Sequence, residues 1–146
     1  SFLIRCHPIL PFEDIVRMLP KRTIIPKNVI ISDNNEVIND ACQADVLLYW
    51  GTAVAVEAIK LGLPVIHFNR GDFFSYDPLF ELTDFKWTVS RDSELSPLLI
   101  KIWDLTNEQF EQQKTKARTY VRGYFNPITD ENLAPFISNI LPSSIS

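Results

Sequence analysis

The sequence is poor in cysteine and histidine, and it has no long apolar run. Its 146 residues include two cysteines, Cys6 and Cys42, and two histidines, His7 and His67. Two cysteines are too few for a disulfide framework, so we expect both to be buried, reduced thiols. The same shortage argues against a metal site, which needs several close ligands. No apolar run reaches the roughly 18 residues that a membrane-spanning helix requires.

Positive charge is also scarce. The chain has 14 Lys and Arg against 18 Asp and Glu, for a net charge of −4, and its basic residues form no stripe. A nucleic-acid-binding surface is therefore not expected, because it would need clustered cations. The length predicts a single domain over residues 1–146. Because an apolar run begins directly after the first residue, a serine, we expect this sequence to be cut from a longer chain or trimmed at its start.

The most informative stretch is residues 44–68, which predicts a strand, a helix and a second strand. Val46 to Trp50 is a short apolar run, typical of a strand that is covered on both faces. Gly51 allows a sharp turn and a close approach of a ligand to the backbone. Thr52 is a good helix N-cap, which would leave the first amides of the helix pointing outward.

The end of this unit is equally well marked. Gly62 suits the left-handed position after a helix, and Pro64 prevents the helix from continuing. Val65 to Phe68 is then the next buried strand. Within the predicted helix, Glu57 is the one charged residue among the Ala, Val and Ile of residues 53–59. It is either a surface partner of Lys60 or an acceptor for ligand hydroxyls beyond a phosphate-binding helix start.

The rest of the chain alternates in the same way. Apolar runs and capping patterns predict further strands at 2–6, 29–31 and 87–90, and helices at 12–19, from 34, from 97 to about 105, after 106 and after 129. The capping residues are Asp33 with Glu36, Ser96 before Pro97, Thr106 with Gln109, and Thr129. This alternation predicts an α/β fold with a doubly wound, parallel, Rossmann-like sheet.

Two motifs resemble a known family. Gly51-Thr52, Glu57 and Gly62-Leu63-Pro64 resemble the donor-binding segment of the carboxyl-terminal domain of GT-B glycosyltransferases. His7-Pro8 at the end of the first strand is similar to the His-Pro motif of bacterial sialyltransferases and glycerophosphotransferase-like families. The resemblance extends from about residue 2 to residue 125. These families usually carry serines where this chain has Trp50-Gly51-Thr52, so the resemblance leaves the donor open.

The resemblance implies a metal-independent transferase that binds a nucleotide-sugar as its substrate, without a cofactor, and stabilises the departing nucleotide. It assigns His7 to the leaving phosphate, and it assigns Gly51, Thr52, Ala53, Glu57, Arg70 and Asp72 to the donor. The acceptor-binding amino-terminal domain lies outside this sequence, so we expect the isolated domain to be inactive. Ser32 and Asp33 either border the nucleotide base or form a simple turn and cap, and His67 is expected to be structural.

Two other functions fit the same pattern. One is half of a nucleotide-sugar 2-epimerase, and the other is a non-catalytic, flavodoxin-like interaction domain. The resemblance to GT-B glycosyltransferases implies a cytoplasmic protein engaged in the synthesis of a surface polysaccharide or glycan, and the sequence shows neither an apolar span nor a signal-peptide pattern. If the acceptor is a lipid-linked glycan, we expect a peripheral contact of the full-length protein with the inner face of the membrane.

Overall fold

The structure is a computed structural model that describes residues 1–7, 9–71, 76–125 and 129–137. Its elements in chain order are β1 (Phe2–Ile4), α1 (Phe12–Met18), β2 (Val29–Ile31), α2 (Val37–Ala41), β3 (Leu47–Tyr49), α3 (Val54–Leu61), β4 (Val65–Phe68), β5 (Lys86–Val89), the 3₁₀ turn η1 (Asp92–Glu94), α4 (Leu95–Trp103), α5 (Asn107–Val121), the 3₁₀ turn η2 (Arg122–Tyr124) and α6 (Asp130–Ile137). The α/β class is confirmed.

The strands lie in two small sheets. β1 pairs with β2, and β3, β4 and β5 pair in that order, with every pair parallel as the sequence predicts. Tyr49 lies opposite His67 and Val65 lies opposite Lys86 in the register of the larger sheet. Among the described residues β1 does not pair with β3, so these residues do not form one continuous doubly wound sheet.

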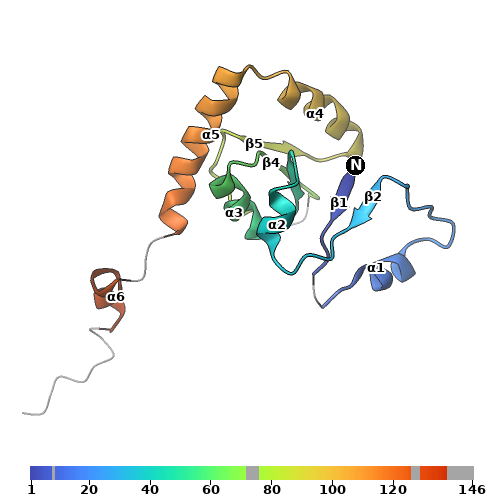
Figure 1. Cartoon of the computed structure of the whole chain (residues 1–146), viewed down its shortest axis with the longest axis horizontal. Coiled ribbons are helices and arrows are strands. Elements are labelled where there is room, and N and C mark those ends of the chain that lie inside the picture. The colour runs from blue at the N-terminus through green and yellow to red at the C-terminus, as the bar shows by residue number, and fades with distance from the viewer. Residues whose placement is uncertain (8, 72–75, 126–128, 138–146) are drawn as a thin grey trace, which may run out of the picture.

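Helices cover both faces of the larger sheet (Figure 1). Val65 and Tyr49 point toward α3 and α5, where they pack with Ile59 and Ala117 in the main core. Ile66, the neighbour of Val65 on the opposite face, packs with Ile102 of α4 in a second, smaller core. This alternation is what a strand covered on both faces requires, because successive side chains point to opposite sides of the sheet.

The amino-terminal part contributes little to either core. α1 has no buried residue, and large apolar side chains of β1 and β2 such as Phe2 and Ile30 are exposed. Cys6 is half-buried and Cys42 is exposed, so the expectation that both thiols are buried is wrong. The stable centre of the fold therefore comprises β3, β4, β5 and the helices α3, α4 and α5.

Several helix ends agree with the local sequence signals. Gly62 ends α3 with a φ of 89°, in the left-handed region that glycine adopts without strain. Thr106 and Gln109 form the expected reciprocal capping box at the start of α5. The Thr129 hydroxyl accepts a hydrogen bond from the amide of Asn132 at the start of α6.

Two predicted caps are wrong. α2 begins at Val37 rather than Asn34, and Glu36 makes no side-chain capping bond, because residues 32–35 form a turn in which the Ser32 hydroxyl accepts the amide of Asn34. α4 begins before Ser96, because the Glu94 carboxylate accepts the amides of Ser90 and Arg91 and stabilises a 3₁₀ turn ahead of the helix.

Candidate functional site

The start of α3 lies at the carboxyl end of β3, and its three predicted donor-binding residues, Gly51, Thr52 and Ala53, are all exposed. The helix begins one residue later than predicted, with Ala53 at the N-cap. The Thr52 hydroxyl still acts as a cap, because it accepts a hydrogen bond from the amide of Val54 at 3.3 Å. That bond occupies one of the amides expected to point outward.

Position 51 needs a glycine because a neighbouring side chain leaves no room for a Cβ atom, rather than because a ligand must approach the backbone there. A Cβ atom at this position would lie 2.9 Å from the Cβ of Tyr76, closer than real Cβ contacts. Tyr76 in turn approaches Trp50 edge to face, with ring centroids 6.0 Å apart. The glycine therefore allows the segment beginning at Tyr76 to pack directly against the turn between β3 and α3.

Trp50, Tyr76 and Arg70 form an exposed aromatic and cationic group beside this turn. The exposed fractions of Trp50 and Tyr76 are 41% and 62%, and the Arg70 guanidinium lies 4.6 Å from the centre of the Trp50 ring. Asp72, the other predicted loop residue, lies outside the described residues. The described part of the loop thus provides stacking surface and positive charge next to an exposed helix start.

Glu57 lies on the exposed side of α3, between the buried residues Val56 and Ala58. It makes no ion pair with Lys60 within the described ranges. The Lys60 ammonium lies instead 4.1 Å from the centre of the Phe125 ring. The expected surface position of Glu57 is therefore confirmed and the expected pair with Lys60 is not formed among the described residues, so the Glu57 carboxylate is accessible to a ligand.

His7 does not contact the start of α3 in the part of the chain that the structure describes. It is exposed beyond the end of β1, where its Nδ1 accepts the amide of Ile9 at 3.2 Å and its carbonyl accepts the amide of Leu10 at 2.8 Å. These bonds hold His7 in a local turn. The two motifs that carry the family resemblance therefore follow strands of different sheets.

The residues that follow β1 and β2 meet at Asp40, which lies in α2 and is buried. Its carboxylate accepts hydrogen bonds from the Arg5 guanidinium at 2.7 Å, from the Ser32 hydroxyl at 2.7 Å and from the Asn34 side chain at 2.5 Å. Burial alone would raise the pKa of Asp40, but these three partners together lower it below its ordinary value. This cluster joins β1, the turn after β2 and α2, so Ser32 has a structural role.

A second buried polar cluster, which no local sequence pattern predicts, lies beneath the turn between β3 and α3. Asp77 accepts hydrogen bonds from the Tyr49 hydroxyl at 2.7 Å, from the amide of Leu79 at 2.9 Å and from the Lys86 ammonium. Lys86 also donates to the carbonyl of Leu79 at 2.6 Å. The cluster thereby joins the first and last strands of the larger sheet to residues 77–79.

His67 borders the same cluster. Its Nδ1 lies 3.7 Å from the carboxylate of Asp77, and its Nε2 lies 3.1 Å from the carbonyl oxygen of Trp50. The side chain is buried, and these two contacts give it the structural role that the sequence suggested. Because His67 contacts both Trp50 and Asp77, it connects the turn before α3 with the segment after Tyr76.

The environment of the cluster favours an ionised Asp77 beside a neutral Tyr49. Burial would raise the pKa of Asp77, but the bonds from Lys86, Tyr49 and the amide of Leu79 lower it below its ordinary value. Burial, followed by the bond to Asp77, raises the pKa of the Tyr49 hydroxyl well above its usual range. The sequence carries no clear signal for this cluster, because Lys86 and Thr88 alternate with Phe85, Trp87 and Val89 as on a strand with one polar face.

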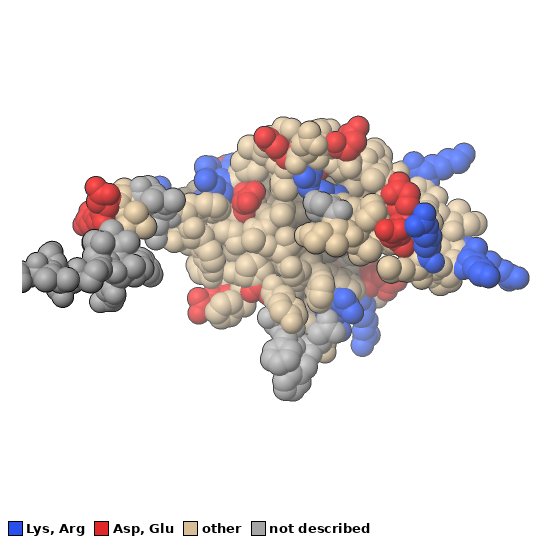
Figure 2. Space-filling view, turned by 90° about the horizontal axis from the view of Figure 1, so that it is seen from below, with Lys and Arg blue, Asp and Glu red and all other residues tan. Residues whose placement is uncertain are grey.

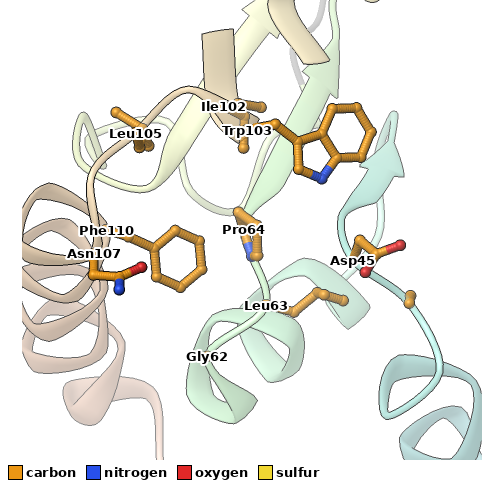
Figure 3. A pocket seen from close by; sticks show the side chains of 10 residues that line it. Asp45, Gly62, Leu63, Pro64, Ile102, Trp103, Leu105, Asn107 and Phe110 are labelled. Carbon is orange, nitrogen blue, oxygen red and sulfur yellow. The ribbon is translucent and has the colours of Figure 1, made fainter. Parts of the chain in front are cut away.

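A hollow of about 440 Å³ lies away from the candidate site (Figure 3). It is lined by residues that lead into β3 and β4, such as Asp45 and Pro64, and by Trp103 and Phe110 of α4 and α5. These residues are at the amino ends of the strands. The exposed start of α3 is at the carboxyl ends, where ligands bind in open α/β sheets.

The described residues contain no group of three or more His, Cys, Asp and Glu side chains that could hold a metal ion. No helix in the same ranges is both long enough and apolar enough to cross a membrane. No family model, curated protein or solved structure matches this chain.

Proposed function

We propose that this chain is the donor-binding domain of a metal-independent GT-B glycosyltransferase. The observation that carries the proposal is the exposed start of α3 at the carboxyl end of β3, next to the exposed rings of Trp50 and Tyr76. A helix start attracts phosphate groups through its free amides and its partial positive charge. Aromatic rings beside it suit the base or sugar of a nucleotide-sugar.

Each candidate residue takes a role in this proposal. The amides of Thr52 and Ala53 bind a phosphate oxygen, and Arg70 contributes positive charge from the neighbouring loop. Glu57, further along α3, accepts hydrogen bonds from the ribose hydroxyls. These groups stabilise the negative charge that develops on the departing nucleotide, by positioning and electrostatics rather than by forming a covalent bond.

The role of His7 requires the two sheets to be parts of one doubly wound sheet. β1 and β3 each have one edge that is not paired among the described residues. If these edges pair, the carboxyl ends of β1 and β3 become neighbours, and His7 lies beside the turn at Gly51. A protonated His7 would then donate a hydrogen bond to the leaving phosphate, and His7 is the catalytic residue that we propose.

The full-length enzyme in this proposal transfers a sugar to a growing glycan in the cytoplasm or at the inner face of the membrane. In this proposal a second domain binds the acceptor, so the domain described here alone binds the nucleotide-sugar without transferring the sugar. A nucleoside diphosphate carries the phosphates and ribose that the site would recognise. It is therefore a suitable probe for the isolated chain.

Isothermal titration calorimetry tests the proposal with ADP, GDP, UDP and CDP, and with CMP as the leaving group of sialyl transfer. We expect saturable one-to-one binding of at least one of them. The same titration with Thr52→Pro, which removes the amide of residue 52, should show weaker binding of that nucleotide. If none of the five nucleotides binds to the folded chain, the alternative of a non-catalytic interaction domain replaces this proposal.

A further inference from the structure

A second hollow, of about 480 Å³, lies between the carboxyl-terminal ends of α3 and α5. Three basic side chains line it: Lys60 of α3, Arg118 of α5 and Arg122 of η2. The ring of Phe125 forms part of its wall and lies beneath the Lys60 ammonium. We call this hollow the basic groove.

The cations of the basic groove differ from the two lysines of α5, Lys114 and Lys116, in having no acidic partner among the described residues. Lys114 pairs with Glu111 at 2.6 Å, and Lys116 pairs with Asp84 at 3.2 Å. In the described ranges, Lys60, Arg118 and Arg122 form no ion pair with an acidic residue. Three cations without acidic partners therefore line one hollow in a chain whose net charge is −4. By contrast, acidic and basic side chains are scattered over the face drawn in Figure 2.

The sequence places Arg118 and Arg122 four residues apart, a spacing at which like charges on a helix repel each other and reduce stability by a few tenths of a kcal/mol. The carboxyl ends of the two helices partly offset this repulsion, because each carries a partial charge of about −0.5. Two helix ends contribute about −1 in total, against three full positive charges. The three cations that line the groove thus outweigh the partial negative charge of the two helix ends.

The basic groove is separate from the start of α3, and its Lys60 follows the proposed ribose acceptor Glu57 by three residues along the same helix. Lys60 lies near the end of α3, whereas Thr52 precedes its start, and the eight residues of the helix extend over about 12 Å. Arg118 and Arg122 lie on elements that do not contribute to the turn at Gly51. A phosphate in the groove therefore occupies a different position from a phosphate at the start of α3.

We propose that the basic groove binds a phosphate-bearing ligand through Lys60, Arg118 and Arg122. Arginine presents paired N–H groups that match two oxygens of one phosphate, and lysine adds a point charge. The exposed ring of Phe125 at the edge of the groove suits an apolar portion attached to the phosphate. The phosphate belongs either to a soluble molecule or to the headgroup of an anionic lipid, and both sources present the same chemistry to these residues.

Two binding measurements distinguish the sources. Pyrophosphate is titrated into the chain by calorimetry, and vesicles of phosphatidylcholine with and without phosphatidylserine are sedimented with the chain. We expect binding in at least one of the two measurements. A soluble ligand gives heat with pyrophosphate alone, whereas a lipid ligand gives co-sedimentation only with vesicles that contain phosphatidylserine. If the chain binds neither probe near physiological salt, the proposal is overturned.

Charge-reversal variants assign the binding to the groove. Arg118→Glu should weaken it on the order of tenfold or more, because one charge-assisted contact becomes a repulsion. Lys101→Glu makes the same change in net charge on the exposed side of α4 and should alter binding less than about twofold, since exposed, distant charges are screened by salt. Equal losses in the two variants would show a nonspecific effect of net charge and would overturn the proposal. Circular dichroism confirms that both variants remain folded.

Discussion

Asp77 and Lys86 form an ion pair in which both side chains are almost inaccessible to solvent, with exposed fractions of 5% and 6%. Two further hydrogen bonds, from Tyr49 and from the amide of Leu79, satisfy the carboxylate. Such a pair is costly to break because the remaining charge stays buried without a partner. It connects β5 to the segment that follows Tyr76, so it also determines where that exposed ring lies.

Replacement of Lys86 by methionine should strongly destabilise the domain. We expect a loss of about 3–5 kcal/mol in the free energy of unfolding, because Asp77 would remain charged in a buried position. Lys116→Met, which removes the exposed partner of Asp84, should cost only about 0.2–1 kcal/mol. Urea unfolding followed by circular dichroism measures both, and the double variant Asp77→Asn/Lys86→Met should recover part of the loss. Similar losses for the two lysine variants would contradict a structural role of the buried pair.

The stability of the domain should fall as the pH decreases below about 5. The pKa values of Asp40 and Asp77 are lowered in the folded state, so protons bind first to the unfolded chain, near an ordinary aspartate pKa of about 3.9. The stabilisation is therefore complete above that value and is lost as the pH falls through the folded-state values.

Urea unfolding between pH 7 and pH 3 measures this dependence, and Asp40→Asn should show a smaller change with pH than the unmodified chain. Asp104→Asn, at an exposed position after α4, is the control and should preserve the full dependence. A stability that stays constant down to pH 3 would be evidence against the two buried carboxylate clusters.

Features that depend on neighbours in sequence could be predicted, and features that depend on distant contacts could not. The left-handed Gly62 and the capping box of Thr106 and Gln109 are set by a few adjacent residues. Strand positions followed from the apolar runs in the same way. The partner of Lys86 could not be found, because Asp77 is separated from it by a turn whose path the sequence does not specify.

The candidate site also combines local features that the sequence predicts with distant contacts that it does not predict. The sequence identified the exposed start of α3, because a glycine and a capping threonine between an apolar strand and a helix are a local signal. It did not reveal that Gly51 makes room for Tyr76, which lies 25 residues further along the chain. The sequence also predicted that His7 lies near this turn. That proximity depends on the pairing of β1 with β3, and hence on contacts between distant segments.

The proposed pairing of β1 with β3 can be tested by hydrogen exchange. The amide of Phe2 bonds to Asn28, and the amide of Leu47 bonds to the carbonyl of Pro64. Backbone groups alternate along a strand, so the amides of Leu3 and Leu48 point to the unpaired edges. If the two edges pair in solution, both amides should exchange at least about 100-fold more slowly than in an unfolded chain.

Exchange monitored by NMR spectroscopy measures this directly. The amide of Ile66 in the central strand β4 is the positive control, since β4 pairs with strands on both sides. Rapid exchange at Leu3 and Leu48 beside slow exchange at Ile66 would show that the two sheets remain separate. In that case His7 has no role at the nucleotide site.

Replacement of Glu57 by alanine tests the candidate site most directly. Hydrogen bonds to a charged acceptor contribute roughly 1.5–3 kcal/mol, so Glu57→Ala should weaken nucleotide binding roughly 10- to 100-fold. Glu57→Gln should lose less, because its amide oxygen still accepts a hydrogen bond. The free energy of unfolding should change by less than about 0.5 kcal/mol, because Glu57 is exposed and Lys60 contacts Phe125 instead.

Glu108→Ala is the matched control, since it removes the same charge from an exposed position in the first turn of α5. Calorimetric titration with the nucleotide that binds the unmodified chain should give an unchanged affinity for this variant. Equal weakening of nucleotide binding by Glu57→Ala and Glu108→Ala would show that the loss reflects the net charge of the chain rather than a contact of Glu57. Unchanged affinity in Glu57→Ala, with binding intact in the parent chain, would place the ribose elsewhere. A selective loss at Glu57 would instead support the position of the ribose along α3, because the two variants differ only in the helix from which the carboxylate is removed.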